Sequence, residues 1–327
     1  MRMTVLASGS RGNSLVVSSN RTRILVDAGL SCRELFKRMR AAEEDPSTLD
    51  AILVTHEHQD HVQGLAVTAR KLGIPVFFTA ATHRSWMRWM TPQKRMTYAD
   101  WLAERQRASA ERKTNTAVEP DLSCAEELAE MLEGKNPERQ EGSDAEANGE
   151  RNGEPKKDPC QLPGVEYFQA GVNFSIGDIA VTPFTIPHDA ADPVGFVFAC
   201  QGIRIGLATD LGYIPGNVQQ QLHNCDALMI ESNHDLEMLR DGPYPWSVKQ
   251  RVMSRVGHLS NDATAGFLEK NYDGRAMYIV LAHLSESNNL PDLAKVTAQR
   301  ALRERMSLLA NKLLLAHQDR PLESISF

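Results

Sequence analysis

The stretch His56-Glu57-His58-Gln59-Asp60-His61 holds three imidazoles and two carboxylates within six consecutive residues. It follows the short apolar run Ala51-Ile52-Leu53-Val54 and precedes a helical pattern from Val62 to Gly73. A strand that leads through a sharp loop into a helix holds functional side chains on rigid supports. Imidazoles with one carboxylate are frequent ligands in catalytic zinc sites. A polar loop that merely caps the helix seldom has this density of ligand groups, so the stretch predicts a metal site.

Further candidate ligands stand just beyond β-rich runs elsewhere in the chain. Asp27 follows Ile24-Leu25-Val26, His188 follows residues 181–187, Asp210 follows residues 205–209, and His283 follows residues 278–282. Strands that end at one edge of a sheet bring such residues together. If the loop turns tightly, Asp60 points away from His56 and His58, so we expect two metals about 3.5–4 Å apart with a bridging carboxylate. Asp27 alone is also consistent with stabilising a turn, and His83, His223 and His317 are expected to be surface or core histidines.

Apolar alternation and helical periodicity interleave along the chain. Strands are expected at 4–7, 14–18, 23–26, 51–55, 76–79, 165–169, 173–176, 179–184, 195–200, 203–208, 227–231, 276–281 and 312–316, and helices are expected to start at Ser31, Val62, Thr82, Ser247, Asn261 and Pro291. Ser31-Cys32-Arg33-Glu34 has the form of a capping box. Many short strands separated by helices predict a layered α/β domain with two sheets and helices outside.

Composition is that of a globular protein, with 42% hydrophobic and 24% charged residues among 327. No apolar run approaches the length that spans a bilayer, and the N-terminal region shows no secretory signal, so no membrane association is expected. The five cysteines form no CxxC pair. An odd count without a framework predicts a reduced, cytoplasmic protein.

Residues 103–163 differ from their flanks, with 9 Lys/Arg and 15 Asp/Glu and few residues that build a core. We expect a single domain formed by 1–102 and 164–327, with 103–163 as an acidic, mostly disordered insertion. A weak helix is possible at 124–132. The interpretation we favour is a tolerated surface loop, and the alternative is a tether that contacts other proteins. The remaining residues carry no net charge, which leaves a nucleic-acid partner open.

The ordered set His56-x-His58-x-Asp60-His61, His188, Asp210 and His283 resembles the metallo-β-lactamase superfamily over nearly all of the chain except the insertion. The resemblance implies a four-layer αββα fold and two divalent metal ions. One ion would be held by His56, His58 and His188, the other by Asp60, His61 and His283, with Asp210 bridging. Asp27 would orient the loop by hydrogen bonding. Zinc is expected and manganese is the alternative, because His/Asp sites accept both.

Four segments resemble the YycJ/WalJ-type branch of that superfamily, namely residues 7–14, 231–235, 257–261 and 282–289. The branch is regarded as 5′-to-3′ DNA exonucleases. Two of the segments also resemble ribonuclease Z, which implies proton transfer by Glu231 and His258. The acidic insertion is a departure from the shorter family members.

The resemblance therefore implies a metal-dependent phosphodiesterase, a 5′-to-3′ DNA exonuclease that uses hydroxide made at a dimetal centre. Its catalytic residues would be Asp60, His258 and Glu231. Helix capping before Asn261 is the alternative role for His258. Other enzymes of the fold hydrolyse a cyclic phosphodiester, lactone or thioester, and a non-catalytic regulatory module is a third class. The intact ligand set argues against the last.

Candidates for substrate binding are Ser8, Ser10, Asn13 and His234. The Ser8–Ser14 loop is rich in glycine and small hydroxyls, which let backbone N–H groups approach a phosphate. Trp86, Trp89 and Trp101 are candidates for stacking on bases, although their spacing is more typical of core packing or a dimer face.

Overall fold

The computed structural model describes residues 1–91, 102–103, 105, 160–302 and 312–327. Residues Met1–Thr91 and Asp158–Phe327 form one compact unit, which contains every element discussed below. The expected insertion at 103–163, the helix at 124–132 and Trp101 lie almost entirely outside the described residues, so these expectations remain predictions. No helix among the described residues combines the length and apolar character needed to cross a membrane.

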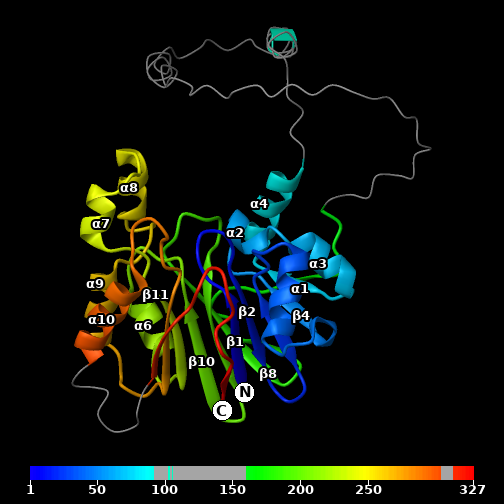
Figure 1. The fold of residues 1–327 in the computed structure, drawn as a ribbon. Coiled ribbons are helices and arrows are strands. Elements are labelled where there is room, and N and C mark those ends of the chain that lie inside the picture. Colours follow the sequence, from blue (N-terminus) through cyan, green and yellow to red (C-terminus); the bar gives the residue numbers. More distant parts are fainter. Residues whose placement is uncertain (92–101, 104, 106–159, 303–311) are drawn as a thin grey trace, which may run out of the picture. The chain divides into compact units, whose positions relative to one another are not determined.

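Two mixed sheets pack face to face in this unit (Figure 1). The first has the order β14-β1-β2-β3-β4-β5-β6 and the second β13-β12-β11-β10-β9-β8-β7. The strands of the first sheet are β1 (Arg2–Ala7), β2 (Ser14–Ser18), β3 (Arg23–Val26), β4 (Ala51–Leu53), β5 (Val76–Phe78), β6 (Val165–Tyr167) and β14 (Ile325–Ser326). Those of the second are β7 (Phe174–Ile176), β8 (Ile179–Thr185), β9 (Val194–Cys200), β10 (Ile203–Ala208), β11 (Ala227–Glu231), β12 (Tyr278–Ala282) and β13 (Lys312–Leu315).

The near-continuous apolar runs arise because both faces of each sheet are covered. In β2, Leu15 and Val17 point into the core between the sheets, whereas Val16 packs toward the outer helices. The same alternation in β3 sends Ile24 inward and Leu25 outward. All these side chains are at most 3% exposed. A one-residue slip in strand register would therefore exchange the side chains that face the core between the sheets with those that face the outer helices, and it would expose neither set.

Helices complete the four layers (Figure 1). Those over the first sheet are α1 (Cys32–Ala41), α2 (Gln59–Val62), α3 (Leu65–Leu72) and α4 (Ala80–Met90), with a short 3₁₀ turn at Pro46–Thr48. Those of the second half are α6 (Gly216–Leu222), α7 (Leu236–Asp241), α8 (Trp246–Val252), α9 (Asn261–Lys270) and α10 (Pro291–Leu302). The predicted αββα arrangement is confirmed.

One helix prediction was wrong. The pattern from Val62 to Gly73 is two helices, because α2 begins at Gln59 and the chain bends at Gly64 before α3. A Cβ at Gly64 would lie 2.0 Å from the carbonyl oxygen of Leu30, so only glycine permits this approach. Beside the bend, the N–H of Ala28 bonds to the carbonyl oxygen of His61 and the N–H of Gly64 bonds to the carbonyl oxygen of Ala28, so the end of the His56–His61 segment lies next to the residues that follow β3. Ser31 is the N-cap of α1, since its hydroxyl accepts a hydrogen bond from the backbone N–H of Glu34, whereas the Glu34 carboxylate bonds to Arg38 and Lys37, so only half of the expected capping box is present.

Candidate metal centre

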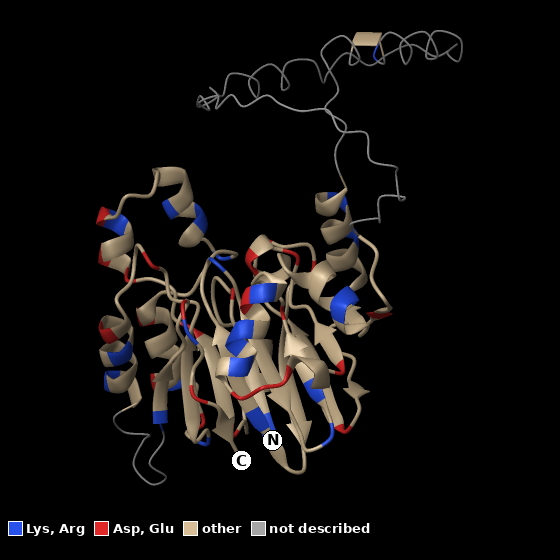
Figure 2. Cartoon of the chain, turned by 45° about the vertical axis from the view of Figure 1, so that its right-hand side comes forward, with Lys and Arg blue, Asp and Glu red and all other residues tan. Residues whose placement is uncertain are grey.

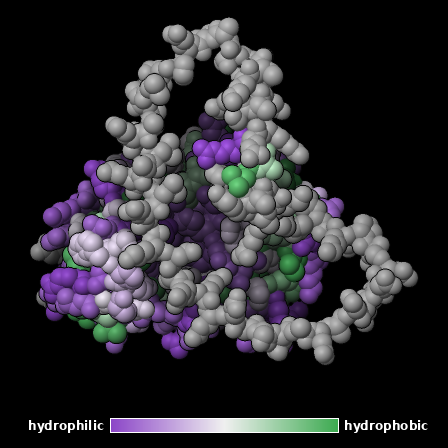
Figure 3. All heavy atoms as spheres, turned by 90° about the horizontal axis from the view of Figure 1, so that it is seen from above, coloured by the Kyte–Doolittle hydropathy of each residue, from purple (hydrophilic) through white to green (hydrophobic). Residues whose placement is uncertain are grey.

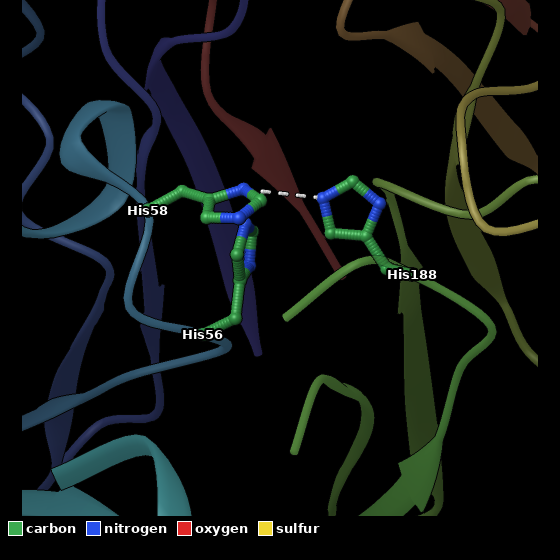
Figure 4. A group of neighbouring side chains, drawn as sticks. All are labelled: His56, His58 and His188. Carbon is green, nitrogen blue, oxygen red and sulfur yellow. Dashed lines mark hydrogen bonds between the residues drawn. The ribbon is translucent and has the colours of Figure 1, made fainter. Parts of the chain in front are cut away.

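The sequence-predicted ligands meet at the ends of strands from both sheets. His56 and His58 follow β4, while His188 follows β8 of the other sheet, and donor atoms of all three lie within 4.8 Å of one another. Figure 4 shows the three rings converging from these separate segments. A second group combines Asp60 and His61 with His283, which follows β12.

Asp210 lies between the two groups. One carboxylate oxygen is 3.5 Å from Nε2 of His61, and the other is 3.2 Å from Nδ1 of His283. The carboxylate also falls in one donor cluster with His56 and His61. Its position is therefore that of a carboxylate able to contact ions in both groups.

Hydrogen bonds orient the rings of the first group. Nδ1 of His188 lies 3.2 Å from the carbonyl oxygen of Gly257, and Nε2 of His58 lies 3.2 Å from that of Asp189. A carbonyl accepts only, so these ring nitrogens carry the protons and the opposite nitrogens carry lone pairs. Those two nitrogens, Nδ1 of His58 and Nε2 of His188, face each other at 3.3 Å (Figure 4). Two lone pairs that face each other repel, and a cation bound between them removes this repulsion.

Carboxylates orient the rings of the second group in the same way. Nδ1 of His61 lies 2.8 Å from Oδ2 of Asp27, and Nδ1 of His283 lies 2.9 Å from Oε1 of Glu231. Both rings thereby turn Nε2 toward Asp60, at 3.5 and 3.6 Å from its Oδ2. A carboxylate that accepts from the far nitrogen fixes the tautomer and raises the basicity of a metal-binding imidazole.

Several would-be ligand atoms are buried without a hydrogen-bond partner among the described residues. They are Nε2 of His56, Nε2 of His283 and Oδ2 of Asp210. An unpaired buried polar atom costs about 1–3 kcal/mol, and more when charged. Because the unpaired atoms are the ones turned toward the other ligands, divalent metal binding explains them, and the residues present fit such ions.

The electrostatics of the cluster favour positive charge. Burial alone would lower the pKa of His61, yet carboxylates raise it well above its ordinary value, and they belong to Asp210, Asp60 and Asp27. The pKa of His283 is raised against its own burial in the same way, mainly by Asp210. In the first group, burial and neighbouring imidazoles hold the pKa of His56 well below the ordinary value, which keeps it neutral, the form that binds metals.

Three site residues have backbones in the left-handed region. The φ angles are 59° at Asp27, 61° at Asp210 and 55° at His283. Asp27 and His283 directly follow β3 and β12, and Asp210 lies two residues after the end of β10, so the chain turns at the end of each strand. A non-glycine residue in this region costs on the order of 1 kcal/mol or more and persists where the surroundings fix it, as at functional sites.

Close backbone packing holds Asp60 in place. A Cβ at Gly29 would lie 1.6 Å from the carbonyl oxygen of Asp60, and that oxygen accepts a 2.7 Å hydrogen bond from the N–H of Asn13. The Nδ2 group of Asn13 lies 3.1 Å from Oδ2 of Asp60 and 3.0 Å from Nε2 of His61. Gly29 and Asn13 thus fix the position of a candidate ligand.

Asp27 is expected to control metal affinity through His61. Its carboxylate also accepts hydrogen bonds from the backbone N–H and hydroxyl of Thr55, at 2.9 and 2.8 Å. Replacing Asp27 by Asn is expected to weaken metal binding about 10–100-fold, because the amide no longer fixes the tautomer of His61. Competition with a chromophoric chelator measures this. The matched control is Asp178→Asn, whose carboxylate binds Ser19 at 2.6 Å on a turn outside the ligand set. Unchanged affinity in Asp27→Asn would mean that Asp27 only stabilises its turn.

The expected substrate-binding residues divide into three groups. Ser10 lines the cavity beside the metal ligands. Ser8 is 1% exposed and its hydroxyl accepts a hydrogen bond from the backbone N–H of His283, so it supports a candidate ligand, as Asn13 does. His234 is 1% exposed, and its backbone pairs with Ser260. Burial lowers the pKa of His234 to about 4. The places of Ser8, Asn13 and His234 differ from the expected contact with substrate, because their polar groups are used or enclosed within the fold.

The remaining histidines and tryptophans lie apart from these groups. His83 stacks on Phe78 and bonds to the hydroxyl of Tyr167, and neither His223 nor His317 belongs to a candidate ligand cluster of the described residues. Trp86 is wholly buried, so it packs in the core and is not available for base stacking. Trp89 is 54% exposed.

Sequence reasoning missed two residues of the site. Thr55 links three groups, since its hydroxyl contacts Asp27, His56 and His61. Asp189 carries a carboxylate oxygen 3.5 Å from Nε2 of His188. Each is a polar neighbour of a predicted ligand, and that adjacency was the available signal.

A cavity of about 200 Å³ opens over the cluster. Its described lining comprises Ser10, His58, Asp60, Asp189, Asp210, Val248, Arg251, Val252, Gly257, His258 and His283. Seen from above, the described surface visible near the centre of the molecule is mainly hydrophilic (Figure 3). The cavity is smaller than the ~300–1,000 Å³ pockets that enclose drug-sized ligands, so a larger substrate would extend beyond it.

Comparison with known proteins gives concordant matches. The chain matches the family model described as metallo-beta-lactamase superfamily over residues 7–151 and the one described as beta-lactamase superfamily domain over residues 142–280. It is 32% identical to exodeoxyribonuclease YycJ of Bacillus anthracis, covering 93% of this chain and 90% of that protein. It is 30% identical to exodeoxyribonuclease WalJ of Streptococcus pneumoniae, covering 90% and 86%.

Solved structures resemble the fold at lower identity. The metallo-beta-lactamase fold protein YhfI from Bacillus subtilis aligns with a TM-score of 0.57 at 14% identity, covering 98% of this chain and 99% of that one. The short form of human tRNase Z aligns with a TM-score of 0.53 at 15% identity, covering 98% of each chain. Both matches extend across the two sheets described above.

Proposed function

The chain belongs to the metallo-β-lactamase superfamily and to its YycJ/WalJ-type branch, and from this premise we propose that it is a metal-dependent DNA exonuclease acting in the 5′-to-3′ direction. His56, His58 and His188 would hold one divalent ion, and a second would be held by Asp60, His61 and His283 with Asp210 between the two. Zinc is the expected ion, and manganese fits the same donors. When bound, such a pair polarises a phosphoryl oxygen and makes water more acidic. The proposal includes a cytoplasmic location, which is supported by similarity to proteins named exodeoxyribonucleases.

The observation that carries the proposal is the Glu231–His258 pair beside the ligand cluster. Nδ1 of His258 lies 2.8 Å from Oε1 of Glu231, and His258 lines the cavity. Although burial would lower the pKa of His258, the carboxylate of Glu231 raises it. The proton on Nδ1 of His258 is thus donated in a hydrogen bond to Glu231. A proton on Nε2 of His258 can then pass to the departing oxygen of a phosphodiester.

Glu231 is built to support this role. It is fully buried, and burial alone would raise its pKa, yet its hydrogen bonds and ion pairs with His258 and His283 lower it. Its second oxygen accepts from the backbone N–H of Leu211 at 2.8 Å. The ionised carboxylate therefore holds a candidate ligand and the candidate acid in one arrangement, and it stabilises the imidazolium form of His258.

Asp60 completes the set of groups that face the substrate. Its carboxylate lines the cavity, whereas its backbone carbonyl is fixed by the close approach of Gly29. In this position the carboxylate can accept a hydrogen bond from the attacking water as well as bind an ion. The small cavity also supports a polymeric substrate, because it admits a phosphodiester and leaves the rest of a strand outside.

End-labelled DNA tests this function against the small-molecule alternative. The metal-loaded protein is incubated with DNA labelled at the 5′ or 3′ end, and in parallel with a cyclic phosphodiester, a lactone and a thioester. We expect a 5′ label to be released at once as a small product, whereas a 3′-labelled strand shortens progressively. The nuclease proposal would be contradicted if DNA stayed intact with both zinc and manganese while a lactone or thioester was hydrolysed.

A further inference from the structure

The helix α8 rises beside the cavity and carries positive charge without acidic neighbours in sequence. Between Asp241 and Asp262 the chain has Lys249, Arg251 and Arg255 and no Asp or Glu. Figure 2 shows basic residues on α8, and acidic residues appear on the neighbouring α7. The rest of the cavity lining includes three carboxylates, those of Asp60, Asp189 and Asp210. Basic residues of α8 therefore lie next to the acidic groups of the cavity.

One face of α8 forms part of the cavity wall. Val248, Arg251 and Val252 all line it, as their three- and four-residue spacing on a helix allows. The helix is anchored in this position, because the ammonium group of Lys249 donates a 2.6 Å hydrogen bond to the carbonyl oxygen of Arg240. At its far end, the backbone N–H of His258 bonds to the carbonyl oxygen of Val252 at 2.9 Å. The helix α8 and the candidate acid His258 therefore lie in one continuous segment of the chain.

Arg251 is the single Lys or Arg among the described residues that line the cavity. Its Nε donates a 2.5 Å hydrogen bond to Oδ2 of Asp189, while 65% of its side chain is exposed. Within the described part of the chain, its two Nη groups have no hydrogen-bond partner. Asp189 thus fixes one edge of the guanidinium and leaves the other edge for an anion, the arrangement in which arginine binds phosphate with two parallel hydrogen bonds.

We propose that α8 forms a strand-binding rim of the metal centre, on which Arg251 grips the backbone phosphate next to the scissile one. This inference rests on the proposed nuclease function. The neighbouring phosphate is favoured because the carboxylate of Asp189 stands between the guanidinium and His188, with its other oxygen 3.5 Å from Nε2 of that ring. Arg251 is therefore separated from the ligand cluster by Asp189. Val248 and Val252 would offer apolar contact to the sugar that joins the two phosphates. Asp189 acts as the positioning residue.

The test compares three variants on two substrates. Arg251→Gln removes the charge, Arg251→Lys keeps the charge without the fork, and Arg40→Gln is the control, an exposed arginine in the last turn of α1. With a labelled oligonucleotide, kcat/KM of Arg251→Gln is expected to fall about tenfold or more, with partial recovery in Arg251→Lys. With bis(p-nitrophenyl) phosphate, which has no neighbouring phosphate, all variants should match the wild type.

Salt dependence provides a readout that a structural role would not change. The plot of log Kd for the oligonucleotide against log salt should lose roughly one unit of slope in Arg251→Gln, because one phosphate contact is lost. The rim proposal would be overturned if Arg251→Gln and Arg40→Gln had the same kcat/KM and salt slope. It would also be overturned if Arg251→Gln lost kcat/KM equally on the oligonucleotide and on bis(p-nitrophenyl) phosphate. If wild-type protein cleaves no DNA, the proposed function fails, and binding of the oligonucleotide still decides the rim: an unchanged Kd and slope in Arg251→Gln would refute it.

Discussion

Replacing Asp60 by Ala is expected to lower kcat for DNA cleavage by about 10³-fold or more, since an ion that stabilises transition-state charge contributes several kcal/mol and each 1.36 kcal/mol is tenfold in rate. The substitution removes the carboxylate that lies within 3.6 Å of Nε2 in both His61 and His283. It also removes an acceptor that faces the cavity. Metal content should fall with activity, because the second group loses one of its three donors.

The control for this experiment is Asp262→Ala, an exposed carboxylate in the first turn of α9. It should leave rate and metal content unchanged and cost at most a few tenths of a kcal/mol in stability, about the size of a helix-dipole contribution. DNA cleavage that persists unchanged in Asp60→Ala would show that the site is wrongly assigned. A melting curve alongside each assay separates loss of the site from loss of the fold.

Replacing His258 by Ala is expected to lower kcat about 10²–10⁴-fold, the usual contribution of a positioned general acid. Metal content is expected to remain that of the wild type, because the ligand groups above do not require His258. The distinction matters, since His258 also falls in a possible ligand cluster with Asp210, Glu231 and His283. Steady-state cleavage and elemental analysis of the same samples separate the two roles.

His223→Ala is the matched control, since this histidine lies 3.8 Å from Asp273 at a half-exposed position outside the ligand clusters of the described residues. His223→Ala should change neither the rate of DNA cleavage nor the metal content. Loss of metal in His258→Ala would make that histidine a ligand, and unchanged cleavage would remove it from the mechanism.

Much of the fold could be predicted from the sequence, because both sheets are buried on two faces and their strands appear as short apolar runs. The clustering of the candidate ligands could also be predicted, since each lies at or shortly after the end of such a run. The turns that aim those ligands could not. Asp and His adopt positive φ more often than most residues, but residue type alone does not identify Asp27, Asp210 and His283 as the positions where it occurs. The bend at Gly64 was missed for the same reason, because the clash that requires glycine involves Leu30.

The loop from Ser8 to Ser14 shows where a local pattern was insufficient. Its glycines and hydroxyls suit a phosphate-binding turn, yet Ser8 and Asn13 direct their polar groups to His283, Asp60 and His61. Sequence indicates that these groups need partners, but not whether the partner is a substrate or the protein itself. The Arg251–Asp189 pair was hidden in a similar way, because 62 residues separate its members.

The most direct test of the central claim is reconstitution of the wild-type protein with metal. The protein is stripped with a chelator, titrated with zinc or manganese, and assayed on 5′- and 3′-labelled DNA while bound metal is measured. We predict no cleavage by the stripped protein, restored cleavage from the 5′ end as ions bind, and saturation near two ions per chain. Cleavage that is independent of metal, or a fully metal-loaded protein that leaves DNA intact, would contradict the account.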